Sequence, residues 1–146
     1  RGKWGFIGHD DRIAIQPVYD EVENFKNGLA VVKQKGLYGV VDKTGKQVIL
    51  PRYEMATVLP NRNIIIRQNN LLGLFGPQGN ILINAKYNRL DDLNNGYIIV
   101  AREGKYGAIT AQGVSTIPLI YDYLTYDPFN NVFYAMVNSE WTDLKF

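Results

Sequence analysis

The stretch GLYGVVDKTGKQVILPRY, residues 36–53, decides the fold. Leu37–Val41 and Gln47–Leu50 are short runs rich in β-branched residues, which is typical of strands. Between them a polar loop ends in Gly45, as in hairpin loops where one residue takes a positive φ. The stretch therefore predicts two antiparallel strands joined by a tight loop. Pro51 lacks a ladder donor and is expected to bend the chain after the second strand.

The same pattern returns every 34 residues. The recurring residues are Gly5, Gly39, Gly73 and Gly107, and Tyr19, Tyr53, Tyr87 and Tyr121. Four repeats without gaps follow, at residues 1–34, 35–68, 69–102 and 103–136, in a single array that covers residues 1–146. The tail, 137–146, contains Glu140-Trp141-Thr142, which resembles the opening of a fifth repeat displaced by one position.

A third strand is expected in each repeat, at Leu29–Val32 and its counterparts Ile64–Ile66 and Ile98–Val100. Two-residue turns such as Lys35-Gly36 then join one repeat to the next. The prediction is an all-β fold of tandem 34-residue repeats, each with about three short antiparallel strands, forming an elongated twisted meander or solenoid. A propeller-like arrangement is the alternative, although a four-stranded blade usually takes about 40 residues or more.

Composition excludes some classes of protein. The 146 residues are 46% hydrophobic and 21% charged, with a formal net charge of +2 and no run of like charges. Nucleic-acid binders usually carry a concentrated basic stripe, so no nucleic-acid partner is expected. No apolar run approaches the roughly 20 residues that span a bilayer, so no membrane span is expected in this segment. Because the chain begins inside a repeat, it reads as a piece of a longer protein.

Three signatures resemble the bacterial WG-repeat (KWG) family. They are Gly2–Ile7 with Pro17–Asp20 and Phe25–Val31, then Gly36–Asp42, then Gly104–Ile109. The resemblance covers nearly the whole chain and implies tandem β-repeats within larger bacterial proteins. It also implies a location in the cell envelope, periplasmic or extracellular rather than cytoplasmic, and no shared enzymatic activity. Repeat three departs from the pattern, with Leu72 at the Trp or Tyr position and Ala85 at the Pro position.

No pattern of side chains predicts catalysis. His9, the one histidine, lies beside Asp10 and Asp11 in a loop, and a zinc site would need several His or Cys ligands. Ser115 and Ser139 could chemically complete a Ser–His–Asp group, but nothing in the spacing supports one. We therefore expect no enzyme, no catalytic residue, no cofactor and no metal.

Three other groups of residues have a structural and a functional interpretation. The column Trp4, Tyr38 and Tyr106 is expected to form a buried ladder between repeats, with a sugar-stacking platform as the alternative. The column Asp20, Glu54, Asn88 and Asp122 is expected to cap a bend, with a repeated cation site as the weaker alternative. Asp91, Asp92, Asp122 and Asp127 are interpreted as solvated turn residues rather than as carboxylate pairs for glycoside hydrolysis.

The repeat is broken after Tyr121, where Tyr123, Tyr126 and Phe129 occupy the polar connection of the fourth repeat. Aromatic residues in variable columns are expected to be exposed more often than those in fixed columns, and an exposed cluster would suit a partner or a glycan. These three residues are the predicted partner-binding residues. The alternative is that the last repeat is a partial cap that refolds its own connection.

Together these features predict a non-catalytic protein-binding or scaffold segment of a larger bacterial protein. Its partner would be another protein or a flanking domain of the parent chain. A glycan- or cell-wall-binding module is the alternative, favoured by exposed coplanar rings, and an enzyme with an unrecognised site is the third hypothesis. Because each repeat buries a face against its neighbours, we expect the segment to pack through its ends, on flanking parts of the parent or on a second copy.

Overall fold

Every regular element that the structure describes is a β-strand. The computed structural model describes residues 4–7 and 13–144, with side chains from Val18 onward. Within these ranges there is no helix, and so none that could cross a membrane. The chain divides into two compact units, Arg1–Ala85 and Lys86–Phe146, and their boundary falls within a strand, Ile81–Tyr87.

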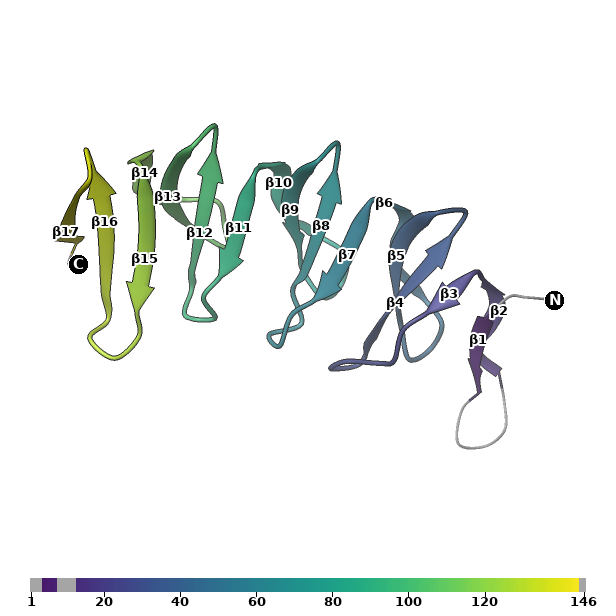
Figure 1. The fold of residues 1–146 in the computed structure, drawn as a ribbon. Helices are drawn as coiled ribbons and strands as arrows, with labels where there is room; N and C mark the ends of the chain where they lie inside the picture. Colours follow the sequence, from purple (N-terminus) through teal and green to yellow (C-terminus); the bar gives the residue numbers. More distant parts are fainter. Residues whose placement is uncertain (1–3, 8–12, 145–146) are drawn as a thin grey trace. The chain divides into compact units, whose positions relative to one another are not determined.

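The first unit contains three antiparallel sheets (Figure 1). Its strands are β1 (Trp4–Ile7), β2 (Ile13–Tyr19), β3 (Glu21–Val22), β4 (Leu29–Gln34), β5 (Leu37–Asp42), β6 (Gln47–Tyr53), β7 (Met55–Val58), β8 (Ile64–Gln68), β9 (Leu71–Phe75) and β10 (Ile81–Tyr87). They pair as β1-β2, β3-β4-β5-β6 and β7-β8-β9-β10. Each strand therefore pairs only with its neighbours in the sequence.

The second unit contains two antiparallel sheets, β11-β12-β13-β14 and β15-β16-β17. Its strands are β11 (Arg89–Asp92), β12 (Tyr97–Arg102), β13 (Lys105–Thr110), β14 (Ser115–Tyr121), β15 (Tyr123–Asp127), β16 (Val132–Val137) and β17 (Glu140–Leu144). In β17, Trp141 pairs with Met136 as Tyr106 pairs with Ala101 in β13. The β16–β17 pair thus has the register of the β12–β13 pair, displaced by one position.

The predicted all-β tandem fold is confirmed, but a complete sheet has four strands where three were expected. The additional strand, seen in β7 and β11, occupies the segment that the sequence suggested was an irregular polar connection. One buried apolar residue anchors it in successive repeats: Ala56, Leu90 and Leu124. The four sheets after β1-β2 therefore begin just after the recurring tyrosine, and each of them crosses a boundary between sequence repeats.

The recurring glycine lies where the fourth strand passes close to the third. The register of the β5–β6 pair shifts twice, so that Gly39 lies opposite a bulge in β6. A Cβ atom on Gly39 would lie 2.5 Å from the carbonyl oxygen of Ile49 and 2.7 Å from the nitrogen of Pro51. Gly73 and Gly107 face backbone atoms at similar distances. Only glycine fits at these positions, which explains why it recurs in the sequence.

Pro51 does not end its strand as expected. Strand β6 continues through Pro51 to Tyr53 and forms one edge of its sheet. A proline on an edge strand can direct its missing N–H away from the ladder, so the strand loses no hydrogen bond to β5. The bend that was expected after Pro51 occurs instead as the bulge opposite Gly39.

The polar column Asp20, Glu54, Asn88 and Asp122 clamps the turn of the hairpin that follows it. The turns are Lys35-Gly36, Asn69-Asn70, Glu103-Gly104 and Asn138-Ser139, all with positive φ. The side-chain oxygens accept hydrogen bonds from Lys35 N (2.7 Å), Asn70 N (3.1 Å), Glu103 N (2.9 Å) and Asn138 N (3.1 Å), respectively. These residues were expected to cap the bend at which they stand, but the turn that they bond to lies 15 or 16 residues further along the chain.

The apolar core of each unit lies between neighbouring sheets. In the first unit, buried Leu29 and Val31 of β4 pack with buried Ala56 and Val58 of β7. In the second unit, Phe133 is the largest fully buried side chain. Tyr38 and Tyr106 of the fixed aromatic column are half-buried against these two cores, which agrees with the ladder interpretation. The side chain of Trp4 lies outside the described residues.

Candidate functional site

The three predicted partner-binding residues occupy different environments. Tyr123 begins β15 and is 40% exposed, and Phe129 follows β15 and is 96% exposed. Tyr126 is half-buried: its ring centroid lies 5.0 Å from that of Phe133, and its hydroxyl is hydrogen-bonded to Asn131. Because β15 is extended, Tyr123 and Phe129 lie near its opposite ends. The three residues therefore do not form one exposed cluster.

Trp141 of β17 is a surface aromatic residue that sequence reasoning missed as a site residue. It is 53% exposed, and its ring centroid lies 6.1 Å from that of Tyr123. Tyr123 in turn lies 5.1 Å from Tyr106. We call Tyr106, Tyr123 and Trp141 the aromatic strip. The signal in the sequence was that Trp141 continues the fixed aromatic column, one position out of phase.

The rings of the aromatic strip are not coplanar. The planes of Tyr123 and Trp141 meet at 89°, and those of Tyr106 and Tyr123 at 53°. Edge-to-face contacts of this kind are favourable between aromatic side chains. They leave an uneven apolar surface, in contrast to the flat platform that a glycan-binding site was expected to present.

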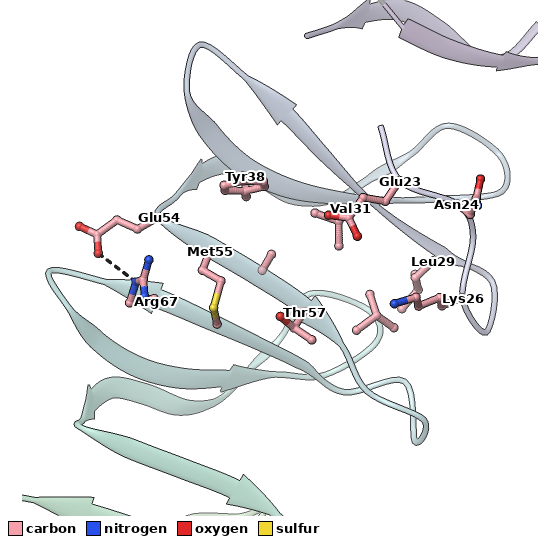
Figure 2. A pocket seen from close by; sticks show the side chains of 12 residues that line it. Glu23, Asn24, Lys26, Leu29, Val31, Tyr38, Glu54, Met55, Thr57 and Arg67 are labelled. Atoms are coloured by element: carbon pink, nitrogen blue, oxygen red, sulfur yellow. Dashed lines mark ion pairs between the residues drawn. The ribbon is translucent and has the colours of Figure 1, made fainter. Parts of the chain in front are cut away.

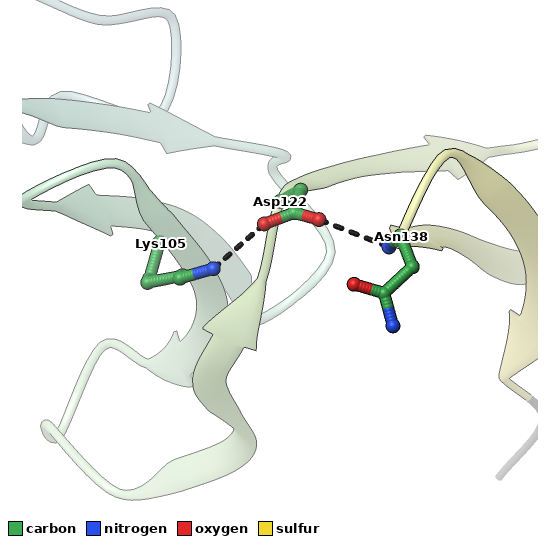
Figure 3. Close-up of polar contacts among 3 residues, drawn as sticks. All are labelled: Lys105, Asp122 and Asn138. Atoms are coloured by element: carbon green, nitrogen blue, oxygen red, sulfur yellow. Dashed lines mark hydrogen bonds and ion pairs between the residues drawn. The ribbon is translucent and has the colours of Figure 1, made fainter.

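Asp122 forms the clamp of the last hairpin and also bonds to Lys105 (Figure 3). One carboxylate oxygen accepts a hydrogen bond of 2.7 Å from Lys105 Nζ, and the other accepts one of 3.1 Å from Asn138 N. These bonds, led by the one from Lys105, hold the pKa of Asp122 below its ordinary value of 3.8. The carboxylate therefore stays ionised and fixes the turn that precedes β17.

Asp122→Asn should lower the thermal midpoint slightly at neutral pH, because the amide keeps an acceptor for Asn138 N but loses the charge that attracts Lys105. The pKa of Asp122 is lower in the folded protein than in the unfolded chain. The stabilisation by its charge is therefore fully present above the unfolded pKa and is lost as the pH falls through the folded pKa. The difference in midpoint between wild type and variant should be constant above about pH 5 and shrink below pH 3.8. Asp91→Asn, at an exposed position, is the control. A difference that persists unchanged at strongly acidic pH would contradict this assignment.

Of the other carboxylates singled out from the sequence, Asp92 and Asp127 also serve turns, whereas Asp91 is an exposed residue of β11 and not a turn residue as expected. Asp92 Oδ1 accepts from Asn94 N at 2.9 Å, and Asp127 Oδ1 accepts from Phe129 N at 2.9 Å. The pKa of Asp127 is lowered, chiefly by its side-chain hydrogen bond with Asn130. Among the residues described, no group of three His, Cys, Asp or Glu side chains could hold a metal ion. His9, Asp10 and Asp11 lie outside the described residues.

A cleft of about 390 Å³ lies between the second and third sheets of the first unit (Figure 2). Its apolar lining comes from Leu29, Val31, Tyr38, Met55, Ala56 and Val58. Its polar lining comes from Glu23, Asn24, Lys26, Glu54, Thr57 and Arg67. Glu54 and Arg67 form an ion pair at one end, with 3.7 Å between Oε1 and Nε. Half of the lining residues are polar, so the cleft is amphipathic, and the sequence did not indicate that it exists.

The cleft exists because its walls carry small side chains. In the second unit, two repeats later, Tyr97, Tyr123, Leu124 and Tyr126 stand at the positions of Leu29, Met55, Ala56 and Val58. Tyr97 and Tyr126 pack there against Phe133, with ring centroids 5.8 Å and 5.0 Å apart. The same framework is therefore filled by aromatic side chains in the second unit and left open in the first.

Comparison with known protein families accounts for the repeats. A family model described as the WG-containing repeat matches residues 4–38, 38–71 and 73–106 in tandem. The chain belongs to the WG-containing repeat family. The matched segments of this WG-repeat chain start and end at or beside the fixed aromatic column, and the last one ends at residue 106, near the start of the fourth repeat. No curated protein matches the chain.

Proposed function

We propose that this WG-repeat chain is a non-catalytic segment of a larger bacterial protein that binds another protein and acts as a scaffold. The exposed pair Tyr123 and Trp141 is the observation that carries the proposal, because large aromatic side chains outside the core anchor partners at low entropic cost. A location of the parent protein in the cell envelope is part of the same proposal, and it rests on the family resemblance alone.

A protein partner is favoured over a glycan by the shape of the aromatic strip. Ring planes at 89° suit the irregular surface of a protein better than the flat face of a sugar. A non-catalytic role is supported by the places where carboxylate pKa values are lowered. Asp42, Asp122 and Asp127 all lie beside turns, where hydrogen bonds to the charged form stabilise the turn.

The test is affinity capture with the immobilised chain from an extract of the bacterium that makes the parent protein, followed by quantitative mass spectrometry. Replacing Tyr123 and Trp141 together by alanine should reduce the amount of a captured protein at least tenfold, because loss of a true anchor costs about 2 kcal/mol or more. Circular dichroism should show an unchanged fold. We expect Phe129→Ala alone to give a smaller loss.

Val114 and Ile120 provide the matched control. They are exposed apolar residues of the same unit, 59% and 58% exposed, and lie outside the aromatic strip. Replacing both by alanine should leave the captured proteins unchanged. If the Tyr123 and Trp141 variant captures the same proteins in the same amounts as wild type, the aromatic strip is not a binding surface. If no protein is enriched over a blank resin, the scaffold proposal itself fails.

A further inference from the structure

Strand β7 has one free edge. It is the last strand in the order β10-β9-β8-β7, so it has a partner strand on one side only. Leu59 N donates to Asn63 O at 2.8 Å just beyond the β7–β8 ladder, in the same register as the ladder. Hydrogen-bonded and non-hydrogen-bonded pairs alternate along an antiparallel ladder, so Met55 and Thr57 bond to β8. The N–H and C=O groups of Ala56 and Val58 therefore point away from β8.

This free edge borders the cleft. All five consecutive residues from Glu54 to Val58 line it, which is the pattern expected of a strand that presents its edge rather than one face. The side chains of Ala56 and Val58 pack on Leu29 and Val31, which belong to the facing sheet. Because Leu29 and Val31 are already covered by these contacts, a chain lying along β7 would find backbone partners on one side and a floor at the half-buried ring of Tyr38.

We propose that the cleft binds an extended peptide segment of a partner protein, which adds to the edge of β7 as a further strand. The proposal deepens the proposed function and rests on it, because the ligand is part of a protein. Ala56 and Val58 each offer one backbone donor and one backbone acceptor, and the two residues are two positions apart. An extended strand carries its own donors and acceptors at the same spacing, so it can pair with all of these backbone groups. Specificity then comes from alternate side chains that face the floor.

The lining indicates the chemistry of that peptide. The inward side chains should be apolar and of moderate size, because they meet the half-buried side chains of Tyr38 and Met55. The rim carries two carboxylates, Glu23 and Glu54, and two cations, Lys26 and Arg67. A rim with no net charge favours a neutral segment with polar outward side chains over a strongly acidic or basic one.

The experiment begins by selecting peptides from a phage-displayed heptapeptide library on the purified chain. The selected peptide, acetylated and amidated at its ends, is then titrated into the isotope-labelled chain. We expect the largest amide shifts at Ala56 and Val58. N-methylation of those alternate peptide amides that face β7 should weaken binding about tenfold, since it removes backbone hydrogen bonds to the strand. Methylation of the intervening amides should have little effect.

Two chain variants test the same site from the protein side. Val58→Tyr copies the residue that the second unit carries at this position and should abolish binding by filling the cleft. Ala56→Pro removes one edge N–H without removing a bond to β8, which an edge strand tolerates, and should weaken binding severalfold. The peptide methylation series needs no chain variant, so it remains decisive if Val58→Tyr fails to fold.

Three results would overturn the proposal: no enriched peptide sequence, equal binding to Val58→Tyr and wild type, or equal effects of methylation in both alternate sets. A titration in which neutral disaccharides rather than peptides shift these amides would assign the cleft to glycans and also overturns it. Because the aromatic strip is tested separately with Tyr123 and Trp141, failure of one site is distinguishable from failure of the other.

Discussion

Gly39→Val is expected to lower the free energy of unfolding by about 3 kcal/mol, near the upper end of the usual cost of overpacking. The first side-chain atom would meet the backbone of β6, 2.5 Å from the carbonyl oxygen of Ile49 and 2.7 Å from the nitrogen of Pro51. Backbone atoms cannot move aside as a flexible side chain does, so β6 must separate from β5. Chemical denaturation monitored by circular dichroism measures the change.

Thr142 provides the control for this substitution. It pairs with Ala135 in β17 as Gly39 pairs with Val32 in β5, so it occupies the glycine position of its repeat. Among the described residues no strand follows β17 in its sheet, and Thr142 is exposed. Thr142→Val should therefore change stability by no more than about 0.5 kcal/mol. Equal effects at both positions would mean that the bulge in β6 does not explain the glycine.

Phe133→Ala should have the largest effect in the second unit, a loss of about 3–5 kcal/mol. Phe133 is 1% exposed and packs between Tyr97 and Tyr126, so its removal leaves a cavity lined by aromatic rings. Thermal and denaturant unfolding of the purified variant measure the loss. A loss below about 1 kcal/mol would show that the neighbouring rings collapse into the space.

Phe129 provides the matched control four residues earlier. The chemical change is the same, but Phe129 is 96% exposed. Phe129→Ala should therefore leave stability within about 0.5 kcal/mol of wild type. Measured together, the two variants separate the aromatic residues that build the fourth repeat from those available to a partner.

The features that sequence predicted correctly are those that depend on backbone geometry. The recurring glycine, the positive-φ turn at Lys35-Gly36 and the clamp residue Asp122 each need a particular residue type at a fixed spacing. These requirements recur from repeat to repeat, so the residues that meet them appear at equivalent positions every 34 residues. The exposure of Tyr123 also followed from its place in a variable column.

The fourth strand and the cleft could not be found in that way. Strands β7 and β11 are edge strands with two buried residues and one buried residue, respectively, so their sequences, MATV and RLDD, share no apolar alternation. The apolar residue that recurs at Ala56, Leu90 and Leu124 was the feature of the sequence that could have indicated this fourth strand. The cleft depends on the volumes of side chains that lie far apart in sequence, such as Leu29 and Val58, and their proximity appears only once the sheets are packed.

The pairing of each strand with its neighbours in sequence has a consequence for folding kinetics. Proteins built of β-sheets usually fold slowly, because distant segments must meet before their contacts can stabilise them. Here every strand pair closes a short loop, and each clamp from Asp20 to Asp122 reaches only 15 or 16 residues. Low contact order of this kind is associated with rapid folding, and in a repeat array folding can start in any repeat and spread to the next. An added or deleted repeat of 34 residues would therefore leave the folding route of the others intact.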